Sequence, residues 1–225
     1  MYRHTDNLGL PVDLPVGKVM CVGRNYLDHI TEMQSQVPVA PLLFMKPKTA
    51  LCHLTQPVSI PADQGVCHNE VEIAVLIGQT LCKAPQGATD AELQKVIWGV
   101  GVGLDLTLRD VQAQLKADGH PWERAKAFDF SCPVSGFVPA CQIASLQSLA
   151  FSLSVNNEVR QQGNSADMMR PVLDLLVQIS QQFTLEPGDI VMTGTPKGVG
   201  PLCHGDKLAV QLADFININT HVVTI

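Results

Sequence analysis

The chain has 225 residues, 46% of them hydrophobic, and a formal net charge of -6 at pH 7. This length and apolar content predict a single globular domain over residues 1–225 that folds without disulfides or a structural metal. The acidic balance, with no run of Lys and Arg, argues against nucleic acid or a membrane surface as a partner, but is compatible with a small anionic ligand in a local cationic cleft. No apolar stretch approaches the ~20 residues of a membrane-spanning helix.

The cysteine pattern predicts a reducing compartment. Seven cysteines are dispersed singly along the chain, with no C-x-x-C pair. An odd, scattered set is typical of reduced thiols rather than a disulfide framework. Residues 1–13 are polar and lack the apolar core of a signal peptide. We therefore expect a cytoplasmic protein, or one from an organelle of similar redox chemistry.

Short strands dominate the prediction for the first half of the chain. Apolar runs bounded by glycine or proline predict strands at residues 18–22, 42–45, 70–77 and 96–104. The first two are joined by a helix-compatible segment at 24–33 and a proline-bounded loop at 34–39. Thr89 and Glu92 have the spacing of a capping box, which predicts a short helix. Three glycines in the run at 96–104 indicate bends or close approach of another backbone.

The second half combines two helices with further strands. Thr107 is expected to cap a helix that carries Leu108, Val111 and Leu115 on one face and ends before Gly119. Two strand-like runs flank the pair at 156–157, both Asn, which predicts a hairpin. A second helix is predicted at 168–183, followed by strands at 190–193, 207–212 and 221–225. Many short strands and few helices predict an α+β or mostly-β body with its strands rolled into a barrel or sandwich.

The sharpest local pattern is a pair of glutamates, Glu70 and Glu72, two positions apart in a predicted strand. Residues two apart in a strand point to the same face, so these carboxylates would lie side by side. Such a pair repels unless a cation or a proton lies between its members, and hard oxygen ligands suit Mg²⁺, Mn²⁺ or Ca²⁺. An exposed strand face with two solvated glutamates is the alternative.

Asp105 ends an apolar, glycine-rich strand, where a lone charge is costly to bury unless it is paired or binds a ligand. A third carboxylate beside the glutamate pair would complete three protein ligands of a metal and leave positions for water and substrate. The alternative is that Asp105 caps the helix that follows.

His29 and Glu32 are three positions apart on a predicted helix and therefore share a face. A carboxylate beside an imidazole raises its pKa and orients it, as expected for a general base that acts on water. The same spacing is commonplace in helices without a catalytic role.

Three basic residues lie near these positions or amid few other charges: Lys46, Arg109 and Lys126. Each could bind a substrate carboxylate, and each could be an ordinary surface residue. The loop at 193–200 is rich in glycine and hydroxyl groups, which suits close approach to an anion. It lacks the spacing of a P-loop, and no G-x-G-x-x-G follows an opening strand, so a nucleotide site is not expected.

In combination, these segments resemble the fumarylacetoacetate hydrolase family from about residue 18 to about residue 210. The matching pieces, in chain order, are C-V-G-R-N-Y at 21–26 leading to His29 and Glu32, F-M-K-P at 44–47, E-V-E at 70–72, G-L-D at 103–105 with R-D at 109–110, A-K-A-F at 125–128 before C-P at 132–133, V-N at 155–156 with R-Q at 160–161, and G-D at 188–189 with T-G-T-P-K-G-V-G at 193–200. One departure is Asn157, where family members often have glycine, which leaves the turn type open.

The resemblance implies a mixed β-roll fold, a homodimer, and Mg²⁺ or Mn²⁺ held by Glu70, Glu72 and Asp105. It also implies that His29 and Glu32 form a water-activating pair on a segment that can act as a lid, with Lys126 beside the metal. The candidates for contacting substrate are Arg24, Lys46, Arg109 and Thr195. The chain resembles the short acylpyruvate hydrolase branch of the family.

The function expected from this resemblance is metal-dependent hydrolysis of the carbon–carbon bond in a small anionic 2-keto acid. The substrate would be a 2,4-diketo acid such as an acylpyruvate or fumarylpyruvate, cleaved to pyruvate and a carboxylic acid. The same metal site could serve an oxaloacetate decarboxylase, a keto–enol tautomerase or a dienoate isomerase, which need no attacking water. A scaffold that binds a metal and an anion without turnover is a more distant alternative.

Overall fold

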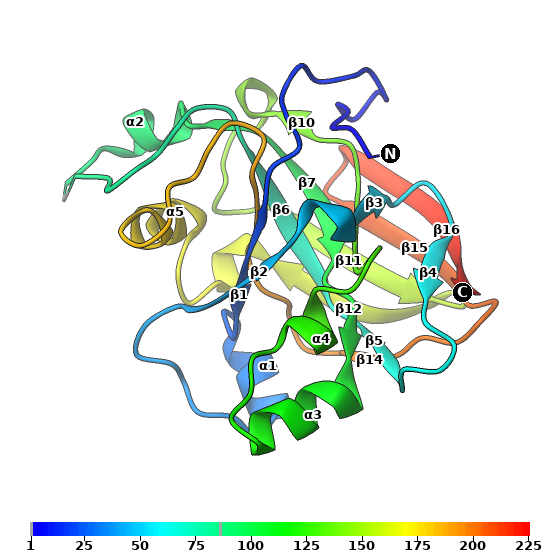
Figure 1. Cartoon of the computed structure of the whole chain (residues 1–225). Helices are drawn as coiled ribbons and strands as arrows, with labels where there is room; N and C mark the ends of the chain where they lie inside the picture. The colour runs from blue at the N-terminus through cyan, green and yellow to red at the C-terminus, as the bar shows by residue number, and fades with distance from the viewer. Residues whose placement is uncertain (1, 86) are drawn as a thin grey trace.

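The computed structural model describes residues 2–85 and 87–225 (Figure 1). Its first half contains β1 (Val19–Gly23), α1 (Leu27–Glu32), β2 (Leu42–Lys46), a 3-10 turn (Lys48–Ala50), β3 (Leu51–His53), β4 (Val58–Ile60), β5 (Cys67–Asn69), β6 (Val71–Ile77), α2 (Asp90–Gln94), β7 (Ile97–Leu104) and β8 (Thr107–Leu108). The strands predicted in this half are confirmed. The capping box is also confirmed, because the Thr89 side chain accepts from the Glu92 amide while the Glu92 carboxylate accepts from the Thr89 amide.

The second half contains α3 (Arg109–Ala117), α4 (Glu123–Lys126), β9 (Cys132–Val134), β10 (Val138–Pro139), 3-10 turns at Ala140–Gln142 and Ser165–Asp167, β11 (Ala150–Val155), β12 (Glu158–Asn164), α5 (Val172–Ser180), β13 (Ile190–Met192), β14 (Gly200–Pro201), β15 (Lys207–Leu212) and β16 (Ile216–Thr224). The predicted hairpin joins β11 to β12, with Asn156 and Asn157 at φ 53° and 68°. These left-handed values are those that a tight two-residue turn requires. No helix in the described ranges has both the length and the apolar content needed to cross a membrane.

Three sequence predictions differ from the structure. Thr107 does not cap α3: it lies in β8, and its hydroxyl donates to the carbonyl of Asp105 at 3.0 Å. Helix α5 begins at Val172 instead of residue 168, because Pro171, with extended backbone at ψ 157°, immediately precedes it. The last strand begins earlier than predicted, at Ile216, since it pairs with β15 along that strand's whole length.

The strands form two large sheets and one small one. The eight-stranded sheet has the order β2-β1-β13-β6-β7-β9-β3, with β10 paired to β7, and the five-stranded sheet has the order β12-β11-β15-β16-β4. Strands β14, β5 and β8 form the small sheet. Figure 1 shows the sheets curled around one another, with α5 outside them and α1, α3 and α4 gathered at one end of the molecule. The predicted mixed β-roll of an α+β protein is confirmed.

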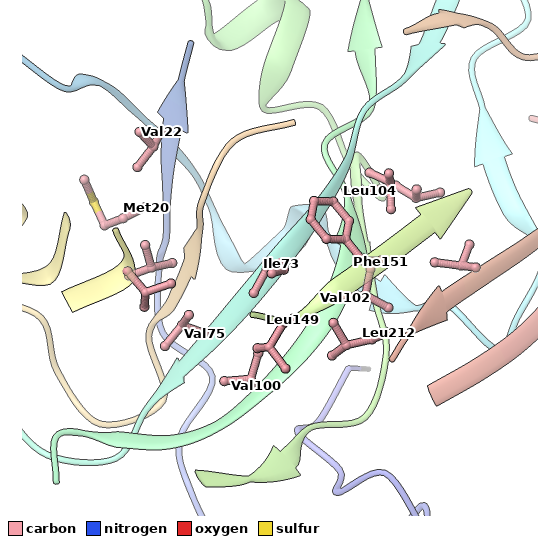
Figure 2. Close-up of a cluster of buried hydrophobic side chains, with 14 of the residues drawn as sticks. Met20, Val22, Ile73, Val75, Val100, Val102, Leu104, Leu149, Phe151 and Leu212 are labelled. Carbon is pink, nitrogen blue, oxygen red and sulfur yellow. The ribbon is translucent and has the colours of Figure 1, made fainter. Parts of the chain in front are cut away.

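The main core lies between the two large sheets. In Figure 2, Ile73 and Val102 of the eight-stranded sheet lie near Phe151 and Leu212 of the five-stranded sheet, and Met20 belongs to the same cluster farther along the sheet. The intervening residues of the same strands, such as Val19 and Ala74, belong to a second buried cluster on the opposite face. Because both faces of β6 are covered, its apolar run is continuous instead of alternating. Packing on both faces fixes the position of β6 and therefore of the acidic residues at its start.

The glycines of β7 permit close approach of the segment at 132–139. A Cβ on Gly101 would lie 2.7 Å from the Ser135 hydroxyl, and a Cβ on Gly103 would lie 2.9 Å from the Val134 side chain. A side chain at either position would therefore push β9 away from β7. The expected close backbone approach is confirmed at these two positions, immediately before the strand delivers Asp105.

Candidate active site

Three carboxylates meet where β6 begins and β7 ends. These strands are antiparallel, with Glu72 opposite Gly103, and the Asp105 amide donates to the Glu70 carbonyl at 2.8 Å. One ligand oxygen from each of Glu70, Glu72 and Asp105 lies within 4.8 Å of the others. The three residues are 5%, 2% and 1% exposed. This burial rules out the solvated-face reading of the glutamates, and Asp105 does not cap α3.

Three basic side chains surround this carboxylate triad. The Lys126 ammonium lies 2.7 Å from Glu70 Oε2 and 2.5 Å from Asp105 Oδ2. Arg109 Nη2 lies 2.5 Å from Glu70 Oε1, and Lys46 Nζ lies 2.8 Å from Asp105 Oδ1. Glu70 and Asp105 therefore have cationic neighbours. By contrast, the hydrogen bond recorded for the Glu72 carboxylate comes from the Gly194 amide, at 2.8 Å.

The pKa values of the two glutamates move in opposite directions. Burial would raise the pKa of Glu70, but Lys126, Arg109 and His29 outweigh it and hold that pKa well below its usual range. Burial raises the pKa of Glu72 well above its usual range, and the neighbouring charges of Asp105 and Glu70 raise it further. The ionised form of Glu72 is therefore disfavoured in this surrounding, and a bound cation would stabilise it.

The triad fits a divalent metal ion. Its donors are hard carboxylate oxygens, which Mg²⁺ and Mn²⁺ prefer. Asp105 Oδ1 is buried and accepts no hydrogen bond, although the Lys46 ammonium lies 2.8 Å from it as an ion-pair partner. A divalent cation bound by the three carboxylates would supply a ligand bond to this oxygen and would stabilise the ionised form of Glu72. Of the residues that the structure describes, these three form the one such cluster.

His29 and Glu32 lie on α1, and the predicted pairing is present. His29 Nδ1 is 3.4 Å from Glu32 Oε2, and the Gly198 amide donates to Glu32 Oε1 at 2.9 Å. The expected rise in the imidazole pKa is wrong. Burial lowers the pKa of His29, and the opposing effects of Glu70 and Glu32 are smaller. A lowered pKa keeps the imidazole neutral at pH 7, which is the form that can accept a proton.

A cavity joins the triad to His29. Its lining includes most of the residues singled out from the sequence: Arg24, His29, Glu70, Glu72, Asp105, Arg109, Lys126 and Thr195. Glu32 is not in the lining, but its carboxylate contacts the ring of His29, which is. The Thr195 hydroxyl donates to the Val71 carbonyl and accepts from Gln161, each at 2.8 Å.

Lys46 does not fit its expected role as a substrate contact. It is fully buried and absent from the cavity lining. Its ammonium donates to the carbonyls of Leu106, Lys126 and Ser131 and to the Ser131 hydroxyl. These contacts place Lys46 beneath Asp105, where it neutralises charge and joins β2 to α4.

Among the lining residues that sequence reasoning did not single out are Gln112, Lys116 and Trp122. Gln112 accepts a hydrogen bond from Arg109 Nη1 at 2.8 Å, and the Lys116 ammonium lies 5.0 Å from the centre of the Trp122 ring. Arg109, Gln112 and Lys116 are spaced i, i+3 and i+7 on α3. That spacing puts the three side chains on one helical face. With Arg109 as a candidate, the same spacing in the sequence would have indicated Gln112 and Lys116 as further site residues.

This fold and acidic site define the class of protein. The chain belongs to the fumarylacetoacetate hydrolase family: the family described as fumarylacetoacetate (FAA) hydrolase C-terminal matches residues 18–223. The resemblance inferred from the sequence is thereby confirmed, and so is membership of an enzyme family.

Individual relatives show which activities accompany this arrangement. The chain is 56% identical over 224 residues to oxaloacetate tautomerase YcgM of Escherichia coli strain K12, covering 99% of this chain and 100% of that protein. It is 44% identical over 204 residues to mitochondrial oxaloacetate tautomerase FAHD1 of Bos taurus, covering 91% and 90%. The crystal structure of fumarylpyruvate hydrolase from Pseudomonas aeruginosa in complex with Mn²⁺ and pyruvate superimposes with a TM-score of 0.91 at 34% identity, covering 100% and 96%.

Proposed function

We propose that this protein is a divalent-metal-dependent oxaloacetate keto–enol tautomerase. The observation that carries the proposal is the shared cavity, in which a neutral imidazole, His29, faces a buried acidic triad and the Lys126 ammonium. Identity of 56% to an oxaloacetate tautomerase over nearly the whole of both chains supports it. The proposal reverses the order expected from the sequence, where carbon–carbon hydrolysis came first and tautomerisation was the alternative.

The chemistry needs one proton moved and no bond between carbons broken. Glu32 lies on the Nδ1 side of His29, so a proton at Nδ1 leaves Nε2 free to accept a proton from C3 of the substrate. The C3–H electrons then form the C2–C3 double bond, and the C2 oxygen takes up a proton. Bound Mg²⁺ or Mn²⁺ would polarise the 2-oxo group as a Lewis acid.

Lys126 has an electrostatic role in this scheme. Burial would lower the pKa of its ammonium, but Asp105 and Glu70 outweigh burial and raise it. The side chain therefore stays charged at pH 7 and stabilises negative charge that develops on the C2 oxygen. Arg109 is held against Glu70 on the same cavity and is suited to the substrate's first carboxylate.

Hydrolysis of an acylpyruvate is the second candidate function. The His29–Glu32 pair favours it, because an oriented neutral imidazole can also remove a proton from water. The similarity of this chain to the Pseudomonas fumarylpyruvate hydrolase also favours hydrolysis. A small anionic 2-keto acid substrate, a homodimer and a cytoplasmic location are further proposals that follow from family likeness and composition.

The test uses metal-stripped protein with added Mg²⁺ or Mn²⁺. Enol-form oxaloacetate is diluted into buffer, and loss of enol absorbance is compared with uncatalysed equilibration, while pyruvate is assayed in parallel. Faster equilibration without pyruvate supports a tautomerase. Stoichiometric pyruvate release would instead identify a decarboxylase. Release of pyruvate and acetate from acetylpyruvate, with no effect on oxaloacetate, would establish the hydrolase and overturn the proposal.

A further inference from the structure

The cations that line the cavity fall into two groups. Lys126 and Arg109 are each paired with carboxylates of the triad. Arg24 and Lys116 line the same cavity, but neither forms an ion pair with any carboxylate in the described ranges. The cavity therefore holds two positive charges that its own acidic residues do not neutralise.

Arg24 lies on a backbone turn with an unfavourable φ angle, which hydrogen bonds of the next residue stabilise. Its φ is 58°, a left-handed value that a non-glycine residue adopts only at some cost. The neighbouring Asn25 is fully buried, and its amide side chain donates to the carbonyls of Arg170 and Thr193 and accepts from the Arg170 amide. These three hydrogen bonds fix the turn. The Arg24 guanidinium donates to the Gln36 carbonyl at 3.3 Å, a neutral partner that leaves its charge unmatched.

Lys116 is positioned by an aromatic ring instead of by an acid. Its ammonium lies over Trp122, 5.0 Å from the ring centre, and both residues line the cavity. Partial burial, together with the nearby charges of Arg109, Arg24 and Lys126, lowers the pKa of Lys116 to about 8. The surroundings of this ammonium are therefore positive, and a bound anion would stabilise its charged form.

We propose that Arg24 and Lys116 form a subsite for a second carboxylate, which makes this a site for 2-oxo dicarboxylates in preference to 2-oxo monocarboxylates. The inference rests on the proposed function, in that the 2-oxo acid end of the substrate is taken to lie at the triad. The first carboxylate then lies near Arg109, and the far end of a short diacid reaches the two unpaired cations. An uncharged acyl arm would leave both cations unmatched in a partly desolvated cleft.

The experiment measures binding by calorimetry to Mg²⁺-saturated protein. The probes are 2-oxoglutarate and 2-oxopentanoate, which share a five-carbon 2-oxo acid chain and differ in the terminal carboxylate. We expect the unaltered protein to bind the diacid at least about tenfold more tightly, as one or two charged contacts of this kind provide. Lys116→Met keeps the aliphatic stem over Trp122 and removes the charge. It should weaken 2-oxoglutarate binding about tenfold and leave 2-oxopentanoate binding within about twofold.

Three further variants separate this role from a general loss of structure. Arg24→Gln should reproduce the selective loss, and Lys116→Arg should restore most of the diacid preference. Lys95→Met, at an exposed position outside the cavity lining, is the matched control and should change neither affinity. Equal binding of both probes to the unaltered protein, binding of neither, or equal losses for both probes in Lys116→Met would overturn the inference. The oxaloacetate enol assay is read separately, so failure of the tautomerase proposal is distinguishable from failure of this subsite.

Discussion

The floor and the rim of the cavity are built in different ways. The floor consists of Glu70, Glu72, Asp105 and Lys126 together with Lys46, which lies behind Asp105 and outside the cavity lining; all are at most 5% exposed and are positioned by β2, β6, β7 and α4. The rim consists of Arg24, His29 and Lys116, which lie on α1, α3 and the turn before α1. Lys46, Glu70, Asp105 and Lys126 have several polar partners each, and Glu72 accepts from the Gly194 amide. Arg24 has one hydrogen bond at 3.3 Å and His29 has one at 3.4 Å.

This contrast teaches how one fold serves several reactions. Removing any member of a densely connected, buried group of charges costs much stability, so we expect the floor to hold a metal ion and developing charge in a fixed geometry. Rim residues have few contacts with the rest of the protein, so substitutions there can change proton transfer and substrate binding without disturbing the fold. We therefore expect floor substitutions to damage stability and metal binding, and rim substitutions to alter rate and selectivity.

The largest expected effect is on the floor, in Lys46→Met. Removing a buried ammonium leaves Asp105 Oδ1 and several carbonyls without their cationic neighbour, which should lower the free energy of unfolding by about 3–5 kcal/mol. Urea unfolding monitored by circular dichroism measures it. Lys197→Met is the matched control, because its ion pair with Asp28 is 65% and 69% exposed and, being screened by water, should contribute little to stability. Equal effects of the two variants would contradict the assignment of Lys46 to the floor.

Metal affinity tests the triad itself. Asp105→Asn retains the shape of the side chain and removes its charge, so the dissociation constant for Mn²⁺ should rise about 100-fold or more. Calorimetric titration of metal-stripped protein gives that constant. Asp174→Asn, at an exposed position on α5, should leave it unchanged. Unaltered Mn²⁺ binding by Asp105→Asn would show that the ion lies elsewhere.

On the rim, His29→Ala should reduce the rate of oxaloacetate enol equilibration about 100-fold or more, the usual size of a general-base contribution. The Mn²⁺ dissociation constant should stay within about twofold, because His29 is not one of the clustered ligands. Parental activity in this variant would exclude His29 as the base. Loss of metal binding instead would move His29 into the floor.

The pH profile sharpens the same assignment. Since burial lowers the pKa of His29, the neutral base persists below pH 6.5, and the acid limb of kcat/KM should have its midpoint below that value. Glu32 opposes this shift, so Glu32→Gln should move the midpoint to still lower pH. A midpoint that rises in Glu32→Gln would contradict this electrostatic relation. Rate measurements across pH 4.5–8 with a constant Mg²⁺ concentration provide the test.

The smallest effect concerns how α1 is attached. Lys197 pairs with Asp28 at 2.9 Å, and the Gly198 amide donates to Glu32, so two adjacent residues of one loop hold the helix over the cavity. Lys197→Met should leave the midpoint of urea unfolding nearly unchanged while increasing amide hydrogen exchange in α1. Unchanged exchange in α1 would show that the Glu32 contact suffices.

Local pattern predicted the parts of this protein that depend on neighbours in sequence. Period-two spacing correctly placed Glu70 and Glu72 on one face, the Thr89–Glu92 spacing predicted a capping box, and two asparagines predicted the β11–β12 hairpin. Each of these features is decided by backbone geometry within a few residues, so a single sequence contains the information.

Tertiary structure decided the features that depend on distant partners. A lysine has the same local signal whether it lies beneath Asp105, as Lys46 does, or over Trp122 in the cavity, as Lys116 does. The lowered pKa of His29 likewise depends on burial by other segments, and the adjacent carboxylate alone predicted the opposite sign. Desolvation and long-range charge are sums over residues brought together by folding, which is why the acidic residues could be predicted from the sequence and the roles of the basic ones could not.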